Sequence, residues 1–367
     1  MKVVPKLGRR VAAVGAAAGV VAASTAVGLA AERYVAGRSL RRAADPWEKE
    51  PFGQVRGDDQ VVRATDGVAL HVEVEEPDPA DRAGRPPVTI VFSHGLALTQ
   101  DAWHFQREGE HGLGDLGRLV FWDQRGHGRS GRGEPDHATI DQLGRDLRAV
   151  IEAVAPDGPL VLVGHSMGGM TVMALADQQP DLFRDRVIGV ALVATSPGRL
   201  AEVTFGVPAA AGRVLRKAAP KALTALTRHP GFVSGTRALG RDLEFVLTKR
   251  YSFATDVPPS LVRFVQSMHD QTPLDVLAEL FPAFDAHDKL QALDTLNGVE
   301  SLILCGECDL MTPAAHSRDM VSRVPGAELV VLPEAGHLVM LEHPDIVSDH
   351  LRGLVERALR SHQSESA

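Results

Sequence analysis

The central pattern is a serine whose sequence setting suits nucleophilic catalysis. Ser166 lies at the centre of the sequence Gly-His-Ser-Met-Gly (164–168), directly after the apolar run 160–163 and before a segment able to form a helix. A sharp strand-to-helix turn presents a serine hydroxyl, and the flanking glycines remove the Cβ atoms that would collide there. A serine also needs a histidine to take its proton and an acid to orient that histidine. The pattern predicts acyl transfer at Ser166.

The partners of this serine are predicted at the ends of two later strands. Asp309 follows the apolar run 302–305, and His337 follows the apolar run 329–332. Loops at the carboxyl ends of parallel strands meet at one edge of a sheet, so these side chains can converge on the serine. The rival acids are Glu307 and Glu334, and the rival bases are His316 and His343.

The elements that must position these residues alternate between strands and helices. Continuous apolar runs, typical of strands covered on both faces, occur at 88–92, 119–122 and 187–193. The segment 140–154 has apolar residues at helical spacing on one face. Asp66-Gly67 is a hairpin turn signal between two strands within 60–74. We therefore expect an α/β fold with a largely parallel sheet and helices on both faces.

The segment 197–299 interrupts this alternation. It is predicted to be mainly helical, is broken by several prolines, and suits a cap over the site. The expected organisation is a first core part (60–196), the helical cap, a second core part (300–358) and a disordered tail (359–367). Within the cap, Arg213, Arg216, Lys217, Lys221 and Arg228 form either a solvated helix face, which we favour, or a basic face near a membrane.

The N-terminal region 1–42 has the features of a membrane anchor. Residues 11–31 carry no charge and would span about 32 Å as a helix. Basic residues flank both sides, so the orientation in the membrane stays open. We expect a single N-terminal membrane-type helix, followed by a linker (43–59), and hence a membrane-associated protein. The alternatives are a cleaved secretory signal, giving a secreted protein, and a helix lying on the surface.

Composition restricts the partners and cofactors. The chain has 367 residues and a formal net charge of -8, which argues against nucleic acid as a partner. It has 2 cysteines, Cys305 and Cys308, too few for a disulfide scaffold or a four-ligand zinc site. The histidines do not fall into metal-ligand spacing, and we expect neither a metal nor an organic cofactor. The oligomeric state is not predicted.

Taken together, these segments resemble the α/β-hydrolase superfamily, in the serine esterase or lipase-like branch with a helical cap, from about residue 60 to 358. The sequence Ser-His-Gly-Leu (93–96) resembles the family's His-Gly oxyanion loop. Residues 123–130, Asp-Gln-Arg-Gly-His-Gly-Arg-Ser, are similar to its Asp-x-Arg-Gly-x-Gly-x-Ser loop. The order serine, aspartate, histidine is that of the family's triad. The resemblance implies an eight-stranded, mostly parallel sheet.

The resemblance also implies a role for each site residue. Ser166 would be the nucleophile, His337 the general base and Asp309 the orienting acid. The backbone N–H groups of Leu96 and Met167 would form the oxyanion hole. Arg125 and His127 are expected to be structural, and His94 is expected mainly to shape its loop. The residues expected near the substrate are His94, Gly95, His165 and Trp103.

The predicted activity is hydrolysis of a small-molecule carboxylic ester. Lipid-like esters are favoured by the anchor and by the apolar residues Trp103, Phe105 and Met167. Relatives that open epoxides or remove halides have an aspartate at the elbow, whereas this chain has a serine. Two alternatives stay open: cofactor-free perhydrolysis (haloperoxidase-like) or carbon–carbon bond hydrolysis on the same fold, and a membrane-tethered binding protein without catalysis. Acyl length and alcohol group are not predicted.

Overall fold

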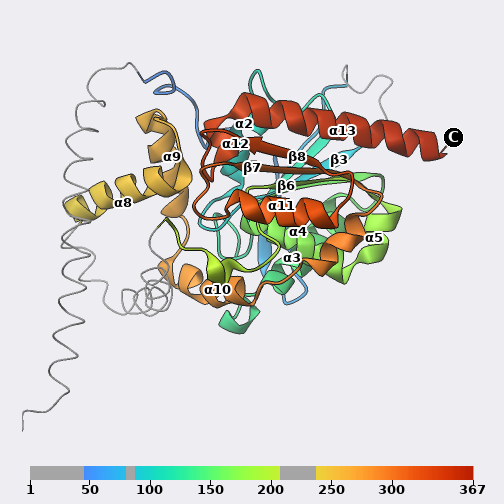
Figure 1. The fold of residues 1–367 in the computed structure, drawn as a ribbon, viewed down its shortest axis with the longest axis horizontal. Coiled ribbons are helices and arrows are strands. Elements are labelled where there is room, and N and C mark those ends of the chain that lie inside the picture. Colours follow the sequence, from blue (N-terminus) through green and yellow to red (C-terminus); the bar gives the residue numbers. More distant parts are fainter. Residues whose placement is uncertain (1–44, 80–86, 207–236, 367) are drawn as a thin grey trace, which may run out of the picture.

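The computed structural model describes residues 45–79, 87–206 and 237–366, and its centre is a sheet of eight strands in the order β1-β2-β4-β3-β5-β6-β7-β8 (Figure 1). The first two strands form the predicted antiparallel hairpin, and β2 is also antiparallel to β4. All later pairings are parallel, as the continuous apolar runs indicate. The strands are β1 (Asp58–Arg63), β2 (Ala69–Glu75), β3 (Thr89–Ser93), β4 (Arg118–Trp122), β5 (Leu160–His165), β6 (Val187–Val193), β7 (Glu300–Gly306) and β8 (Glu328–Leu332).

Helices cover both faces of the sheet, and each set shares a separate apolar core with the strands. One set consists of α3 (Ile140–Val154), α4 (Met167–Gln178), α5 (Pro180–Asp185) and α11 (Ala314–Arg323). The other consists of η1 (Gln100–Trp103), α2 (His104–Arg107), α12 (Val339–Glu342) and α13 (Pro344–Ser366). The short η2 (Pro135–His137) belongs to neither set and lies in the loop before α3. The predicted α/β architecture with helices on both faces is confirmed.

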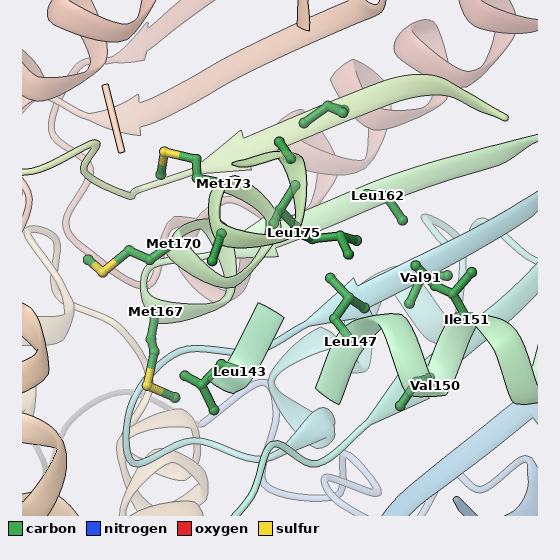
Figure 2. Close-up of a cluster of buried hydrophobic side chains, with 14 of the residues drawn as sticks. Val91, Leu143, Leu147, Val150, Ile151, Leu162, Met167, Met170, Met173 and Leu175 are labelled. Atoms are coloured by element: carbon green, nitrogen blue, oxygen red, sulfur yellow. The ribbon is translucent and has the colours of Figure 1, made fainter. Parts of the chain in front are cut away.

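The amphipathic pattern of α3 explains how this helix attaches to the sheet. Figure 2 shows Leu147 and Ile151 of α3 beside Val91 of β3 and Leu162 of β5. These four side chains are at most 1% exposed. Burial of each such side chain contributes about 1.5–3 kcal/mol. This packing fixes β3 and β5, the two strands that lead into the site.

The described part of the insertion between β6 and β7 is helical, as the sequence predicts. Its described residues contain no strand, only an isolated bridge between Gly198 and Asp288. The basic residues predicted for a cap face, at 213–228, lie outside the described residues. The described elements are η3 (Leu200–Glu202), α8 (Arg237–Ser252), α9 (Pro259–His269), α10 (Leu274–Ala286) and η4 (Gln291–Leu296).

The segment predicted as a linker is packed against the cap over residues 45–57. Asp45 accepts hydrogen bonds from the backbone N–H and the hydroxyl of Ser260 at the start of α9, both at 2.8 Å. The ring of Phe52 stacks on that of Phe264 with 4.5 Å between centroids. Because the segment is mostly polar, the sequence did not predict the packing of its aromatic residues Trp47 and Phe52. The predicted linker is therefore wrong for these residues, which fasten α9 to the rest of the fold.

The prediction of a disordered C-terminal tail is also wrong for the residues described. Helix α13 continues through Ser366. Leu359 packs against the core, and the Ser361 hydroxyl donates to Glu300 Oε1 at 2.9 Å. These contacts extend the helix beyond its buried stripe.

The predicted membrane helix, residues 11–31, lies outside the described residues. Within the part of the chain that is described, helices are either too short or too polar to cross a bilayer.

Candidate active site

Ser166 occupies a strained turn between β5 and α4. Its backbone has φ 52° and ψ -116°, a conformation that costs energy for any residue other than glycine. A Cβ on Gly164 would lie 2.5 Å from the Gly168 carbonyl oxygen, and a Cβ on Gly168 would lie 2.1 Å from that of Ser93. Both glycines are therefore required by close backbone contacts. The predicted strand-turn-helix setting of the serine is present.

The structure brings the three predicted catalytic side chains together. His337 Nε2 lies 3.0 Å from Ser166 Oγ, and His337 Nδ1 lies 2.8 Å from Asp309 Oδ2. The histidine and the aspartate are 7% and 4% exposed, so the hydrogen bond between them is shielded from water. The rival acids Glu307 and Glu334 are exposed side chains. The arrangement can move a proton from the serine hydroxyl to the imidazole.

The Asp309 carboxylate is held by donors on both oxygens. Oδ1 accepts from the N–H groups of Met311 and Thr312 at 2.7 and 2.9 Å, and Oδ2 accepts from the Thr312 hydroxyl at 2.7 Å. Burial raises the pKa of Asp309, but the neighbouring His337 and these hydrogen bonds outweigh it, so the pKa lies below its usual value. An ionised carboxylate keeps the imidazole proton on Nδ1 and leaves Nε2 free to accept.

Thr312 is a residue that the sequence analysis missed. Its hydroxyl also lies 3.4 Å from His337 Nδ1, next to the hydrogen bond between acid and base. The signal was the three-residue spacing from Asp309, because aspartate commonly accepts hydrogen bonds from the backbone two or three residues later.

Two further side chains hold the backbone of the site. His165 Nε2 donates to the His337 carbonyl oxygen at 3.0 Å, and the Thr195 hydroxyl donates to the Ser166 carbonyl oxygen at 2.6 Å. Burial lowers the pKa of His165 to about 3, so this imidazole is neutral and keeps one N–H for the bond. Both contacts fix main-chain groups and leave the reacting atoms free.

The predicted oxyanion donors lie on two segments that touch Ser166. Met167 is the first residue of α4, and N–H groups in the first turn of a helix have no partner within it. Leu96 lies in the turn after β3, beside Gly95, where a Cβ would come within 3.2 Å of Ser166 Cβ. The structure thus places the two donor segments next to the serine, and their role in binding an oxyanion stays a prediction.

Comparison with known proteins places the chain in a family. Residues 90–350 match the model of the alpha/beta hydrolase family. The chain belongs to the alpha/beta hydrolase family. It is similar to the sn-1-specific diacylglycerol lipase ABHD11 of Mus musculus, with 29% identity over 281 residues that cover 71% of this chain and 78% of the relative. It is also similar to a monoacylglycerol lipase of Mycolicibacterium smegmatis, with 27% identity covering 75% of this chain and 88% of that one.

Solved structures agree with the fold of this alpha/beta hydrolase. A thermophilic esterase from Thermogutta terrifontis superposes with a TM-score of 0.63 at 23% identity, covering 82% of this chain and 98% of the esterase. At this identity the likeness establishes the fold alone. The family resemblance predicted from the sequence motifs is confirmed.

Three side chains predicted near the substrate of this hydrolase are completely buried. His94, Trp103 and His165 are all 0% exposed. His94 Nδ1 donates to the Gly95 carbonyl oxygen at 2.7 Å, and its Nε2 accepts from the Gln124 N–H at 2.9 Å. Both ring nitrogens of His94 are therefore occupied in shaping the loop, and Trp103 packs against core rings. Contact of these side chains with substrate stays a prediction.

The loop after β4 is held by a buried ion pair. Arg125 donates to both carboxylate oxygens of Asp146 and to Asp66. A Cβ on Gly128 would lie 2.3 Å from Asp123 Oδ2, so this glycine permits a close turn. These contacts agree with the structural role expected for Arg125.

One group within the described residues has the spacing of metal ligands, namely Asp59, His71 and Glu73, with ligand atoms within 4.8 Å of one another. The guanidinium groups of Arg107 and Arg129 already pair with Glu73. Burial raises the pKa of Glu73, but hydrogen bonds from His71 and a backbone N–H and the charge of Arg107 bring it down to about 2. The group is an ion-pair cluster that stabilises the strand β2.

Proposed function

We propose that this alpha/beta hydrolase cleaves carboxylic esters through an acyl-enzyme on Ser166. The supporting observation is the hydrogen-bonded chain from Asp309 through His337 to the serine hydroxyl. Ser166 Oγ attacks the ester carbonyl carbon while its proton passes to His337 Nε2. The ester C–O bond then breaks, and the departing alcohol takes that proton. Water attacks the acyl-enzyme by the reverse proton route and releases the carboxylic acid.

The oxyanion formed in each step would be bound by the N–H groups of Leu96 and Met167. Donors that are fixed before the reaction need no reorganisation as charge develops on the oxygen. Each such donor accounts for about 10²–10³ in kcat in comparable sites. The neutral, buried His94 would hold the first of these donors in place through its bond to the Gly95 carbonyl oxygen.

A lipid-like acyl ester is the substrate class that we propose. Two similar proteins are named as lipases, one for diacylglycerol and one for monoacylglycerol. The uncharged segment 11–31 would hold the enzyme at a membrane, where such esters reside. We include membrane association through this segment in the proposal.

Turnover of p-nitrophenyl esters of graded acyl length tests the chemistry. The Ser166→Ala variant should lose both ester turnover and labelling by a fluorophosphonate, while the wild-type protein shows both. Undiminished turnover in this variant would end the proposal. Labelling of Ser166 without turnover of any ester would instead favour perhydrolysis or carbon–carbon bond hydrolysis, and an unlabelled folded protein would favour a binding role.

Fractionation tests the membrane association. The full chain should sediment with membranes, and a variant lacking residues 1–42 should remain in the supernatant. A shortened variant that still sediments would show that the N-terminal segment is not the tether. Protein released into the medium and shortened at its N-terminus would support a secreted enzyme with a cleaved signal.

A further inference from the structure

Glu342 is a buried carboxylate that the proposed reaction does not use. It is the last residue of α12, five positions after His337, and is 8% exposed. Within the described residues it forms no ion pair, although an ionised carboxylate is costly to bury without compensation. Its partners are instead four hydrogen-bond donors from two separate segments. This arrangement makes Glu342 a connection between the two segments.

The first segment is the part of the cap that joins α8 to α9. Glu342 Oε1 accepts from the N–H of Ala254 at 2.8 Å and from both the N–H and the hydroxyl of Thr255 at 2.6 Å. Three donors on one carboxylate oxygen are charge-assisted hydrogen bonds, which are stronger than neutral ones. They fix this turn of the cap relative to α12.

The second segment is the loop that carries His337. Glu342 Oε2 accepts from the N–H of Gly336, the residue before the histidine, at 2.6 Å. The N–H of Leu338, the residue after it, donates to the Ser252 carbonyl oxygen at 2.8 Å. A Cβ on Gly336 would lie 2.8 Å from Phe253 Cα and from Ala254 N, so loop and cap are in direct backbone contact. The backbone N–H groups of the two residues that flank His337 are thus attached to the cap, that of Gly336 through Glu342 and that of Leu338 directly.

We propose that Glu342 is a positioning residue that ties the His337 loop to the cap segment 252–255. This inference rests on the proposed role of His337 as the base. The imidazole must keep two hydrogen bonds at once, at 2.8 Å to Asp309 and 3.0 Å to Ser166. A displacement of about 1 Å at a reacting group can cost about 100-fold in rate. Attachment of the loop to the cap restricts such displacement.

Glu342→Gln separates the two connections. The side-chain oxygen can keep the three donors of Ala254 and Thr255, but the amide NH2 then faces the N–H of Gly336, donor against donor. The hydrogen bond from Glu342 to the loop is lost while its contacts with the cap persist. We expect kcat for p-nitrophenyl acetate and for a long-chain p-nitrophenyl ester to fall by the same factor, about 10- to 100-fold. KM for both esters should change by less than about three-fold.

A matched control separates positioning from general stability. Glu73→Gln removes the charge of another buried carboxylate, one that lies in the ion-pair cluster on β2. This control should lower the melting temperature and leave kcat of the folded enzyme unchanged. A Glu342→Gln variant that melts earlier but keeps wild-type kcat would overturn the inference. So would a variant that loses activity only toward the long-chain ester through KM, because that pattern belongs to substrate contact by the cap.

Two further variants complete the test. If Glu342→Gln does not fold, Thr255→Val is the deciding variant, because it removes only the hydroxyl donor and keeps the side-chain shape. A fall of about three-fold or more in kcat for p-nitrophenyl acetate supports the inference, and an unchanged kcat overturns it. Ser166→Ala is measured in parallel. Residual turnover in that variant would indicate failure of the proposed function itself, whereas an inactive Ser166→Ala beside a fully active Glu342→Gln would indicate failure of the positioning role alone.

Discussion

Replacement of Asp309 by asparagine provides the sharpest test of the site. Oδ1 of the aspartate accepts from two backbone N–H groups, whereas Oδ2 faces His337 Nδ1 and the Thr312 hydroxyl. An asparagine would keep its carbonyl oxygen on the two backbone donors and would turn its NH2 group toward the histidine. The ring nitrogen Nδ1 must then accept, and the imidazole proton moves to Nε2. In that tautomer Nε2 is a donor toward Ser166 and cannot take its proton.

The magnitude follows from the loss of the base rather than from a change of shape. In a comparable triad, reversal of the tautomer lowers kcat by about 10⁴-fold, which corresponds to about 5.5 kcal/mol of transition-state stabilisation. The same replacement preserves size and keeps the two backbone hydrogen bonds. We therefore expect the folded structure to persist while kcat falls by about four orders of magnitude at neutral pH.

The assay is initial-rate hydrolysis of a short-chain p-nitrophenyl ester, with circular dichroism to verify folding. Glu307→Gln and Glu334→Gln serve as controls, because these exposed rival acids should leave kcat unchanged. A folded Asp309→Asn variant within 10-fold of wild-type kcat would refute the assignment of the acid. A large loss in either glutamate control would transfer the role to that residue.

Three further changes have outcomes set by the structure. Gly95→Ala would place a Cβ 2.7 Å from His165 Nδ1, which should displace the oxyanion loop and lower kcat by about 10²-fold with little change in KM. Glu73→Gln should lower the free energy of unfolding at pH 7 by about 3 kcal/mol. A carboxylate whose pKa is lowered in the folded protein stabilises the fold above its unfolded-state pKa, and this contribution is lost as the pH falls through the folded-state pKa. The variant should therefore show a flatter decline in stability between pH 4.5 and about 2. Asp45→Ala removes the acceptor for Ser260 at the start of α9 and should cost about 1 kcal/mol in urea denaturation.

Each of these outcomes can be contradicted by a simple measurement. Wild-type kcat in Gly95→Ala would mean that the loop tolerates the extra methyl group without moving a donor. An unaltered acid limb of the stability curve in Glu73→Gln would show that this carboxylate does not carry the predicted linkage. For Asp45→Ala, an unchanged denaturation midpoint would indicate that the contact with α9 contributes nothing to stability.

The strands and the triad could be predicted because their signals are local. Each of the apolar runs predicted as strands between 88 and 332 became a strand, and the residues that follow β5, β7 and β8 had to meet at one sheet edge. The convergence of Ser166, Asp309 and His337 follows from this topology. The amphipathic stripe of α3 was equally local, and its predicted bounds agree with the structure.

The remaining features depend on contacts between distant segments. The segment 45–57 has a polar composition, and only the position of Phe264 on α9 shows why Phe52 is held there. The end of α13 could not be predicted, because the last residues of this helix are polar and lie beyond its buried apolar face. Glu342 carries no signal of its own, since three of its four hydrogen-bond donors lie at Ala254 and Thr255 of the cap, far away in sequence.

The order of the site residues along the chain has a consequence for biosynthesis. Ser166 precedes His337 by 171 residues, and the histidine loop follows the last strand of the sheet. A polypeptide emerging from the ribosome can form the serine turn from β3, β5 and α4 before His337 has been added to the chain. Such an immature chain holds an inert alcohol. Under the proposed function, ester cleavage requires that β8 has joined the sheet and brought His337 to the serine.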